Sequence, residues 1–213
     1  MPKIDLQFAI YGETIPADHG YHLLSSISKI IDSAHGDDTI GIHPISGIPI
    51  GNRMLSLNKK SKLTFRLDVD RIKEFLSLGG KTLVINGNKI QVGVPKSNAL
   101  IPSARLYSRL VIIKGFMEPE SFLKAAQKQL KEMKIEGKPY LIKQPEIAEA
   151  NKDKKSGTHS PYLRRTIRIR NKEIVGFAMG IEQLTAEESI LVQENGIGGR
   201  RRFGCGIFIP DRK

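Results

Sequence analysis

The chain has 213 residues, of which 39% are hydrophobic, and it carries 34 Lys and Arg against 22 Asp and Glu. This length suits one large or two compact globular domains, and the formal charge of +12 favours a polyanionic partner such as nucleic acid. The single cysteine, Cys205, excludes an internal disulfide and any metal site built from several cysteines, and no apolar run is long enough to span a membrane.

The positive charge is concentrated in the second half of the chain. Residues 1–103 have a net charge of +3, whereas the remainder has +9, which favours a dedicated binding face over general solubility. The lone cysteine and an N-terminus that alternates polar and apolar residues instead of resembling a secretory signal predict a cytoplasmic protein.

The first half predicts the element order βαββαβ. Period-two hydrophobicity predicts a strand over 3–11, and helical spacing predicts a helix from an N-cap at Asp18 to about residue 33. A Gly/Pro/His-rich loop over 40–52 then leads into a predicted hairpin of 53–57 with 62–67. A short helix over 69–78 and a hairpin of 82–94, turned at Asn86-Gly87, follow.

The second half repeats this order. We expect a strand over 105–113, a helix over 119–134, a strand pair of 163–170 with 173–182, a helix opened by a Thr185/Glu188 capping box, and a final strand in GCGIFIP. Residues 145–160 are polar and aperiodic and predict a loop. The predicted fold class is α+β with two tandem ferredoxin-like (βαββαβ, RRM-like) domains, at 1–100 and 104–213.

The segment GIGGRRRFGCG, directly after the last helix, is the most specific local pattern. Glycines let backbone N–H groups approach phosphate oxygens, and arginines supply fork-shaped donors. Helix capping and strand packing could explain some of the glycines but leave the arginines unexplained. The predicted RNA-binding residues here are Gly196, Gly198, Gly199, Arg200, Arg201, Arg202, Gly204 and Gly206.

A second basic pattern lies in YLRRTIRIR. Strand alternation predicts Arg164, Arg168 and Arg170 on one face, at a spacing of about 6.6–6.8 Å that is close to that of phosphates on an extended single strand. The alternative interpretation is an ordinary solvated sheet face.

Gly196-Ile197-Gly198, five residues and Gly204-Cys205-Gly206 together resemble the signature glycine-rich loop of the CRISPR RAMP superfamily. With DHGYHLLSSI near the start and the doubled βαββαβ order, the whole chain resembles the Cas-six family of CRISPR repeat-processing endoribonucleases, in particular its Myxan-subtype branch. The resemblance implies an RNA partner, the CRISPR repeat transcript (pre-crRNA), and an association with a CRISPR effector complex, as a monomer or a homodimer.

The resemblance also implies cleavage by the 2′-hydroxyl of the substrate, without metal or cofactor, assisted by a histidine soon after the first helix. His43 matches this position and is the predicted catalytic residue. His22 and His35 are the reserve candidates for this role, and the other histidines in the sequence are His19 and His159. The family tyrosine within that helix aligns with Ser28, which puts a full Tyr–His–Lys set in doubt.

Tyr21 and Arg53 are further reserve candidates for assisting the reaction. Asp37-Asp38 and Asp68-x-Asp70 could hold metal ions, but turns and a helix cap explain them more simply. The alternative functions are a non-catalytic RNA-binding RAMP subunit and a small-ligand regulatory domain; the charge of the second half speaks against the latter.

Overall fold

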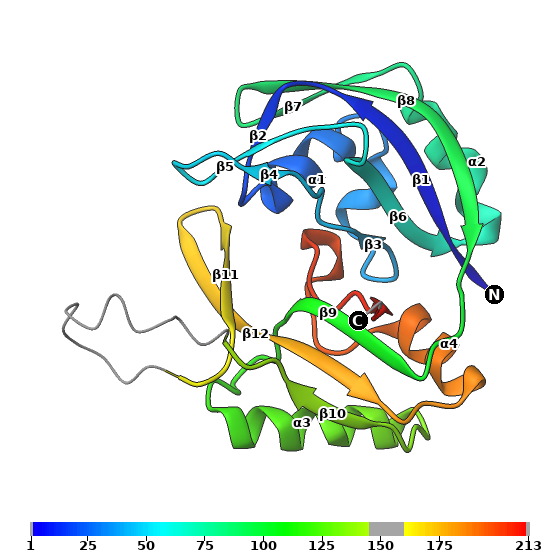
Figure 1. Ribbon diagram of the computed structural model, residues 1–213. Helices are drawn as coiled ribbons and strands as arrows, with labels where there is room; N and C mark the ends of the chain where they lie inside the picture. The colour runs from blue at the N-terminus through cyan, green and yellow to red at the C-terminus, as the bar shows by residue number, and fades with distance from the viewer. Residues whose placement is uncertain (1, 145–159, 212–213) are drawn as a thin grey trace, which may run out of the picture.

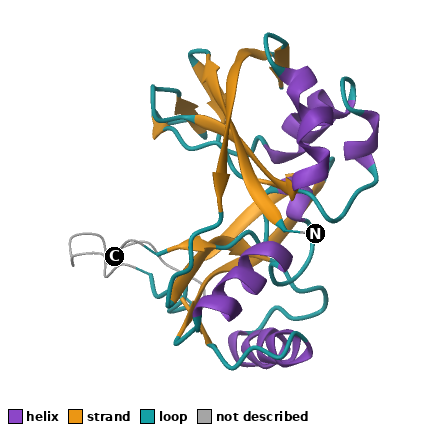
Figure 2. Cartoon of the chain, turned by 90° about the vertical axis from the view of Figure 1, so that its right-hand side faces the viewer, coloured by secondary structure: helices purple, strands orange, loops and turns teal. Residues whose placement is uncertain are grey.

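The computed structural model describes residues 2–144 and 160–211. The chain forms two lobes that lie one above the other, each an antiparallel sheet with helices on one face (Figures 1 and 2). The fold is therefore a mixed arrangement of helices and curled antiparallel sheets. No helix within the described ranges is long and apolar enough to cross a membrane.

The N-terminal lobe is built on a five-stranded sheet with the order β3-β6-β1-β8-β7. These strands are β1 (Lys3–Tyr11), β3 (Gly41–Ile42), β6 (Lys62–Asp68), β7 (Thr82–Ile85) and β8 (Asn88–Ala99). One face is covered by α1 (Gly20–Ser28), α2 (Ile72–Phe75) and the flanking 3-10 turns η1 (Asp32–His35), η2 (Val69–Arg71) and η3 (Leu76–Leu78). A small sheet of β2 (Thr14–Pro16), β5 (Met54–Ser56) and β4 (Ile48–Pro49) lies beside it.

The C-terminal lobe has the sheet order β10-β12-β9-β13, with β11 paired to β12. These strands are β9 (Arg105–Val111), β10 (Lys138–Leu141), β11 (Arg164–Ile169), β12 (Lys172–Glu182) and β13 (Ile209–Pro210). Its helices are α3 (Pro119–Glu132) and α4 (Ala186–Asn195), and the 3-10 turn η4 (Arg201–Phe203) precedes β13. Four strands of each sheet share one arrangement, namely β3-β6-β1-β8 in the N-terminal lobe and β10-β12-β9-β13 in the C-terminal lobe. Numbered by their order along each half, with β7 and β11 left out, both sets lie as second, third, first and fourth.

Each lobe has its own apolar core, which follows from the strand alternation. In β1, Leu6, Phe8 and Ile10 are buried against the helices, and Phe8 meets Phe65 edge to face with ring centroids 5.9 Å apart. The opposite face of this sheet carries Asp5 and Tyr11, and we call it the helix-free face because no helix of its own lobe covers it. Helix α4 of the C-terminal lobe reaches this face at Arg66, which donates to Gln193 O. Burial of apolar side chains drives the folding of each lobe, and the helix-free face is left for polar contacts.

Several predicted elements are confirmed with small shifts in their ends. The Asn86-Gly87 turn joins β7 to β8 with positive φ at both residues. The capping box is present, because Thr185 Oγ1 accepts from Glu188 N and Glu188 Oε2 accepts from Thr185 N. The last strand is shorter than predicted, β10 was not predicted, and most of the predicted loop, residues 145–159, lies outside the described residues.

Three predictions in the first half are wrong. Residues 53–57 and 62–67 do not form a hairpin: β5 pairs with β2 and β4, and β6 pairs with β1 and β3. Alternation identifies a strand and its faces but not its partner. The first helix ends at Ser28 instead of about residue 33, and Asp18 is not its cap, because its carboxylate accepts from Arg168 N at 2.7 Å.

Candidate functional site

The glycine-rich segment connects α4 to β13 and packs against the N-terminal lobe (Figure 1). A Cβ at Gly20, the first residue of α1, would lie 2.7 Å from Phe203 O, and one at Gly204 would lie 2.8 Å from Pro44 Cγ. Side chains at these positions would push the two lobes apart. The segment therefore belongs to the contact between the lobes.

Most of its glycines have a packing reason. Gly196, Gly198, Gly204 and Gly206 have φ between +64° and +85°, and a Cβ at Gly196, Gly198 or Gly206 would overlap a backbone oxygen of a neighbouring segment. Gly199 alone among the predicted glycines has open space around it. Positive φ together with close contacts to neighbouring segments thus accounts for four of the five predicted glycines.

The three arginines of the segment do not act as one exposed group. Arg200, with φ +68°, is exposed, and Arg202 is partly exposed and forms an ion pair of 2.7 Å with Asp38. Arg201 is only 7% exposed and lies inside the molecule. Burial, and next the nearby positive charge of Arg66, lowers the pKa of Arg201 to about 10. The predicted RNA contact of Arg201 stays a prediction, and the 3-10 turn η4 directs this side chain inward.

We expect the double variant Arg200→Ala/Arg202→Ala to bind single-stranded RNA with a flatter salt dependence than the wild type. Each lost phosphate contact lowers the slope of log K against log salt by roughly 0.7 for a single strand, so the double variant should lose about 1.4. Filter binding between 50 and 300 mM salt measures the slope. Lys128→Ala, on the exposed side of α3, is the control, and an unchanged slope in the double variant would refute phosphate contacts here.

Arg200 and Arg202 border a cavity of about 790 Å³ between α1, the turn from β11 to β12 and the glycine-rich segment. We call it the basic cavity, because five of its lining residues are basic and one, Asp32, is acidic. Its basic residues are Lys29, Arg170, Lys172, Arg200 and Arg202, and its other polar or aromatic residues are Tyr21, Ser25, Ser28, His35, Asn171 and Phe203.

His35 is the histidine of the basic cavity. It is the last residue of η1, it is exposed, and none of the contacts among the described residues engages its ring. Tyr21 stacks on Phe203 at a centroid distance of 6.4 Å and an interplanar angle of 14°, which closes one side of the cavity. Ser28 Oγ is buried without a hydrogen-bond partner among the described residues. An open imidazole and several cations thus meet at one place.

His22 and Arg53, the other reserve candidates, line a neighbouring cavity of about 570 Å³. Tyr21 and Arg170 border both cavities, so the two adjoin each other. Arg53 is exposed, with φ +55°, in the turn between β4 and β5.

The predicted row of arginines on β11 is only partly present. Arg164 donates to Met117 O and lies over the ring of Phe177, with its guanidinium carbon 5.1 Å from the ring centroid. Arg168 is exposed, and Arg170 has φ +55° and leaves the strand at the turn, where it lines the basic cavity. All three arginines were predicted to lie on one face of the strand. The turn after β11 redirects Arg170, and of the three arginines only Arg170 borders the basic cavity.

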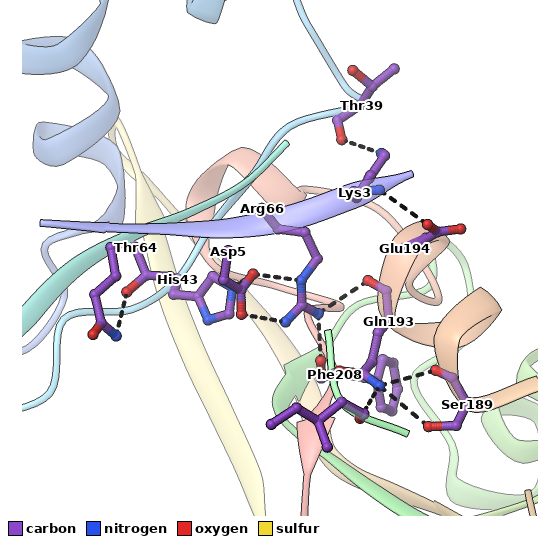
Figure 3. A network of polar contacts seen from close by, with 12 residues as sticks. Lys3, Asp5, Thr39, His43, Thr64, Arg66, Ser189, Gln193, Glu194 and Phe208 are labelled. Carbon is purple, nitrogen blue, oxygen red and sulfur yellow. Dashed lines mark hydrogen bonds and ion pairs between the residues drawn. The ribbon is translucent and has the colours of Figure 1, made fainter. Parts of the chain in front are cut away.

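His43, the first-ranked catalytic candidate, lies in a different environment (Figure 3). It borders a third cavity, of about 690 Å³, which lies between the two sheets and which we call the inter-sheet cavity. The His43 side chain is 15% exposed. Its Nε2 is buried, 3.3 Å from Asp5 Oδ1. Burial lowers the pKa of His43, whereas the contact with Asp5 opposes that change. The catalytic role of His43 stays a prediction.

Asp5 is held mainly by Arg66, a side chain only 1% exposed. Arg66 Nε and Nη2 donate to the two carboxylate oxygens of Asp5 at 2.8 and 2.9 Å, and Nη1 donates to Gln193 O at 3.0 Å and to Phe208 O (Figure 3). Because Arg66 belongs to β6 and both carbonyls belong to the C-terminal lobe, this guanidinium joins the lobes. Neither Asp5 nor Arg66 was predicted as a site residue, although both are polar residues on the non-core face of predicted strands.

His19 and Cys205 have structural roles. Ile45 N donates to His19 Nε2 at 2.9 Å, so Nδ1 carries the hydrogen and donates to Pro16 O at 2.9 Å. Burial lowers the pKa of His19 to about 4 and raises that of the Cys205 thiol to about 12. Neither group is available for chemistry near neutral pH. His159 lies outside the described residues.

Comparisons with known proteins agree on one family. A family model described as Cas6 Crispr matches residues 4–213. A curated relative from Myxococcus xanthus (strain DK1622), named CRISPR-associated endonuclease Cas6, is 31% identical over 210 residues, which make up 99% of this chain and 82% of the relative.

Solved structures show the same overall fold at low sequence identity. A structure named CRISPR associated protein Cas6 matches with a TM-score of 0.68 at 10% identity, and a Cas6-related protein from Pyrococcus furiosus with 0.67 at 12% identity; each match covers 99% of this chain and 100% of the other. A RAMP protein described as binding different RNA substrates matches with 0.65 at 14% identity, over 98% and 99% of the two chains. At these identities the likeness supports the fold alone.

Proposed function

The chain belongs to the Cas6 family, and we propose that it is an endoribonuclease that cleaves CRISPR repeat RNA in the basic cavity. The observation that supports this location is that an exposed histidine, His35, lines the same cavity as five cationic side chains. Cations bind the RNA backbone, and an imidazole can transfer protons near neutral pH.

We propose a metal-independent reaction. The 2′-hydroxyl oxygen of the nucleotide before the cut attacks the phosphorus, and the bond from phosphorus to O5′ breaks. One proton leaves the 2′-hydroxyl and one joins O5′. The products are a 2′,3′-cyclic phosphate and a 5′-hydroxyl end.

His35 carries one of these two proton transfers in this proposal. The pentavalent phosphorane gains negative charge, which Lys29, Arg200 and Arg202 would stabilise from the cavity wall. Tyr21 and Phe203 give an aromatic wall for a base beside the cut.

The geometry favours His35 over His43. A general acid or base must reach the reacting atom within hydrogen-bond distance. His43 Nε2 is buried against Asp5, whereas His35 faces open space beside the cationic residues. We propose that His43 instead helps to position Asp5 and Arg66 at the contact between the lobes.

We propose further that the lobes are tandem ferredoxin-like domains, with residues 1–100 and 104–213. The shared strand order and the separate apolar cores support this division. The basic cavity then lies at the junction of the two domains, where α1 of one meets the C-terminal segment of the other.

Cleavage is expected to persist in excess EDTA, because a 2′-hydroxyl nucleophile needs no metal-bound water. The assay is single-turnover cleavage of labelled repeat RNA with and without EDTA, with mass spectrometry of the new ends. Loss of cleavage in EDTA that magnesium restores would contradict the mechanism. If folded protein binds the repeat but never cuts it, the alternative of a non-catalytic RNA-binding subunit gains support.

A further inference from the structure

The helix-free face of the N-terminal sheet carries an exposed aromatic ring that the basic cavity does not use. Tyr11, at the end of β1, is 62% exposed. β1 is the middle strand of the sheet, so this ring stands on a broad surface and not at an edge. Leu6, Phe8 and Ile10 point to the core, which leaves Asp5, Gln7, Ala9 and Tyr11 together on the open face.

A glycine lets the Tyr11 ring lie against the sheet. A Cβ at Gly93 would be 2.9 Å from Tyr11 Cε2 and 3.2 Å from Ala9 Cβ. The ring therefore lies over Gly93 at its Cε2 atom, and most of the residue is open to solvent. Exposed aromatic rings on a sheet surface are a common platform on which proteins stack RNA bases.

Lysines surround this ring on the same face. Cross-strand pairing sets Gln91 opposite Tyr11, Lys62 opposite Ala9 and Lys96 opposite Gln7, and Lys89 lies two residues from Gln91 along β8. None of the three lysines forms an ion pair with a residue in the described part of the chain, so their charges are available to phosphates.

The inter-sheet cavity lies farther along the same face. Gln7 and Asn98, which line it, offer amide donors and acceptors, and Gln7 is four residues from Tyr11 along β1. At about 3.4 Å per residue this separation is about 14 Å, or roughly two steps of an extended RNA strand.

We infer that Tyr11 stacks a base of a single-stranded stretch of RNA, whose backbone lies along Lys62, Lys89 and Lys96 on the open face of the N-terminal sheet. This inference rests on the proposed function, because that function supplies the RNA. The subsite is separate from the basic cavity, so it contributes to affinity and to the register of the strand but not to the chemical step.

Tyr11→Ala is expected to weaken binding of repeat RNA by about 5- to 100-fold, the range that loss of one stacked base gives. Tyr11→Phe should bind within about twofold of the wild type, because phenylalanine stacks as well. Binding is measured by fluorescence anisotropy on repeat RNA with a 2′-deoxy nucleotide at the cut.

A set of abasic repeats identifies the stacked base. In the wild type, one abasic position should weaken binding, and in Tyr11→Ala the same position should have no further effect, because both changes remove one contact. Leu76→Ala, an exposed apolar residue on the helix-covered side, is the control and should bind like the wild type.

Additive effects at every abasic position, wild-type binding by Tyr11→Ala, or equal weakening by Tyr11→Phe would each overturn the stacking subsite. Such a result with wild-type protein that still cleaves the repeat leaves the proposed function intact. Failure of the wild type to bind and cleave any repeat would instead overturn the proposed function.

Discussion

Replacing His35 by alanine is expected to slow cleavage of repeat RNA by about 10²–10⁴-fold, while the affinity for the repeat stays within a few-fold of the wild type. Removing one general acid or base costs on this order, roughly 3–5 kcal/mol of barrier, because the group acts in the transition state and adds little to ground-state binding. Single-turnover rates at saturating enzyme and separate binding titrations measure the two effects. A repeat with a single 2′-deoxy nucleotide before the cut lacks the nucleophile and therefore gives the background rate of the assay.

His43→Ala and His22→Ala are the matched controls. We expect His22→Ala to cleave at close to the wild-type rate and His43→Ala to lower mainly the stability, since its ring contacts Asp5 at the contact between the lobes. Melting temperatures show whether each variant is folded. If His43→Ala is inactive and folded while His35→Ala cuts normally, the catalytic histidine is the one that the sequence ranked first. If neither change matters, the histidine mechanism fails.

Arg66→Ala is expected to lower the free energy of unfolding by roughly 3–5 kcal/mol, the cost of removing one partner from a buried ion pair. The change leaves Asp5 without its two strongest donors, and it leaves Gln193 O and Phe208 O without a donor from β6. Urea unfolding followed by circular dichroism measures the loss. Arg105→Ala removes an exposed pair, 3.9 Å from Glu182, and should cost at most about 1 kcal/mol.

The same variant should change the response to acid. Burial by itself raises the pKa of Asp5, but contacts with His43 and Arg66 outweigh burial and lower it below the usual aspartate range. A lowered folded-state pKa stabilises the protein above the unfolded pKa of about 4, and this stability is lost as the pH falls below that value. We therefore expect the wild type to lose more stability than Arg66→Ala between pH 6 and pH 3. An equal loss in both proteins would show that the ion pair contributes nothing.

Local chemistry made the most regular elements predictable from the sequence. The alternation in β1, the Asn86-Gly87 turn and the capping box of α4 depend on residues near one another in the chain, so their patterns appear directly in the sequence. The pairing of β5 was missed because the choice between strand partners depends on residues distant along the chain.

The candidate site shows the same division. By itself, the sequence determined the family, the basic character of the second half, the glycine-rich segment and a short set of histidines that included His35. Only the tertiary structure decided which of these residues meet. It turns Arg201 inward between Arg200 and Arg202, buries His43 Nε2 against Asp5, and opens His35 to the cavity beside Lys29 and Arg170. The physical reason is that exposure and ion pairing depend on how the two lobes pack together, and contacts between residues so far apart in the chain leave no periodic pattern in it.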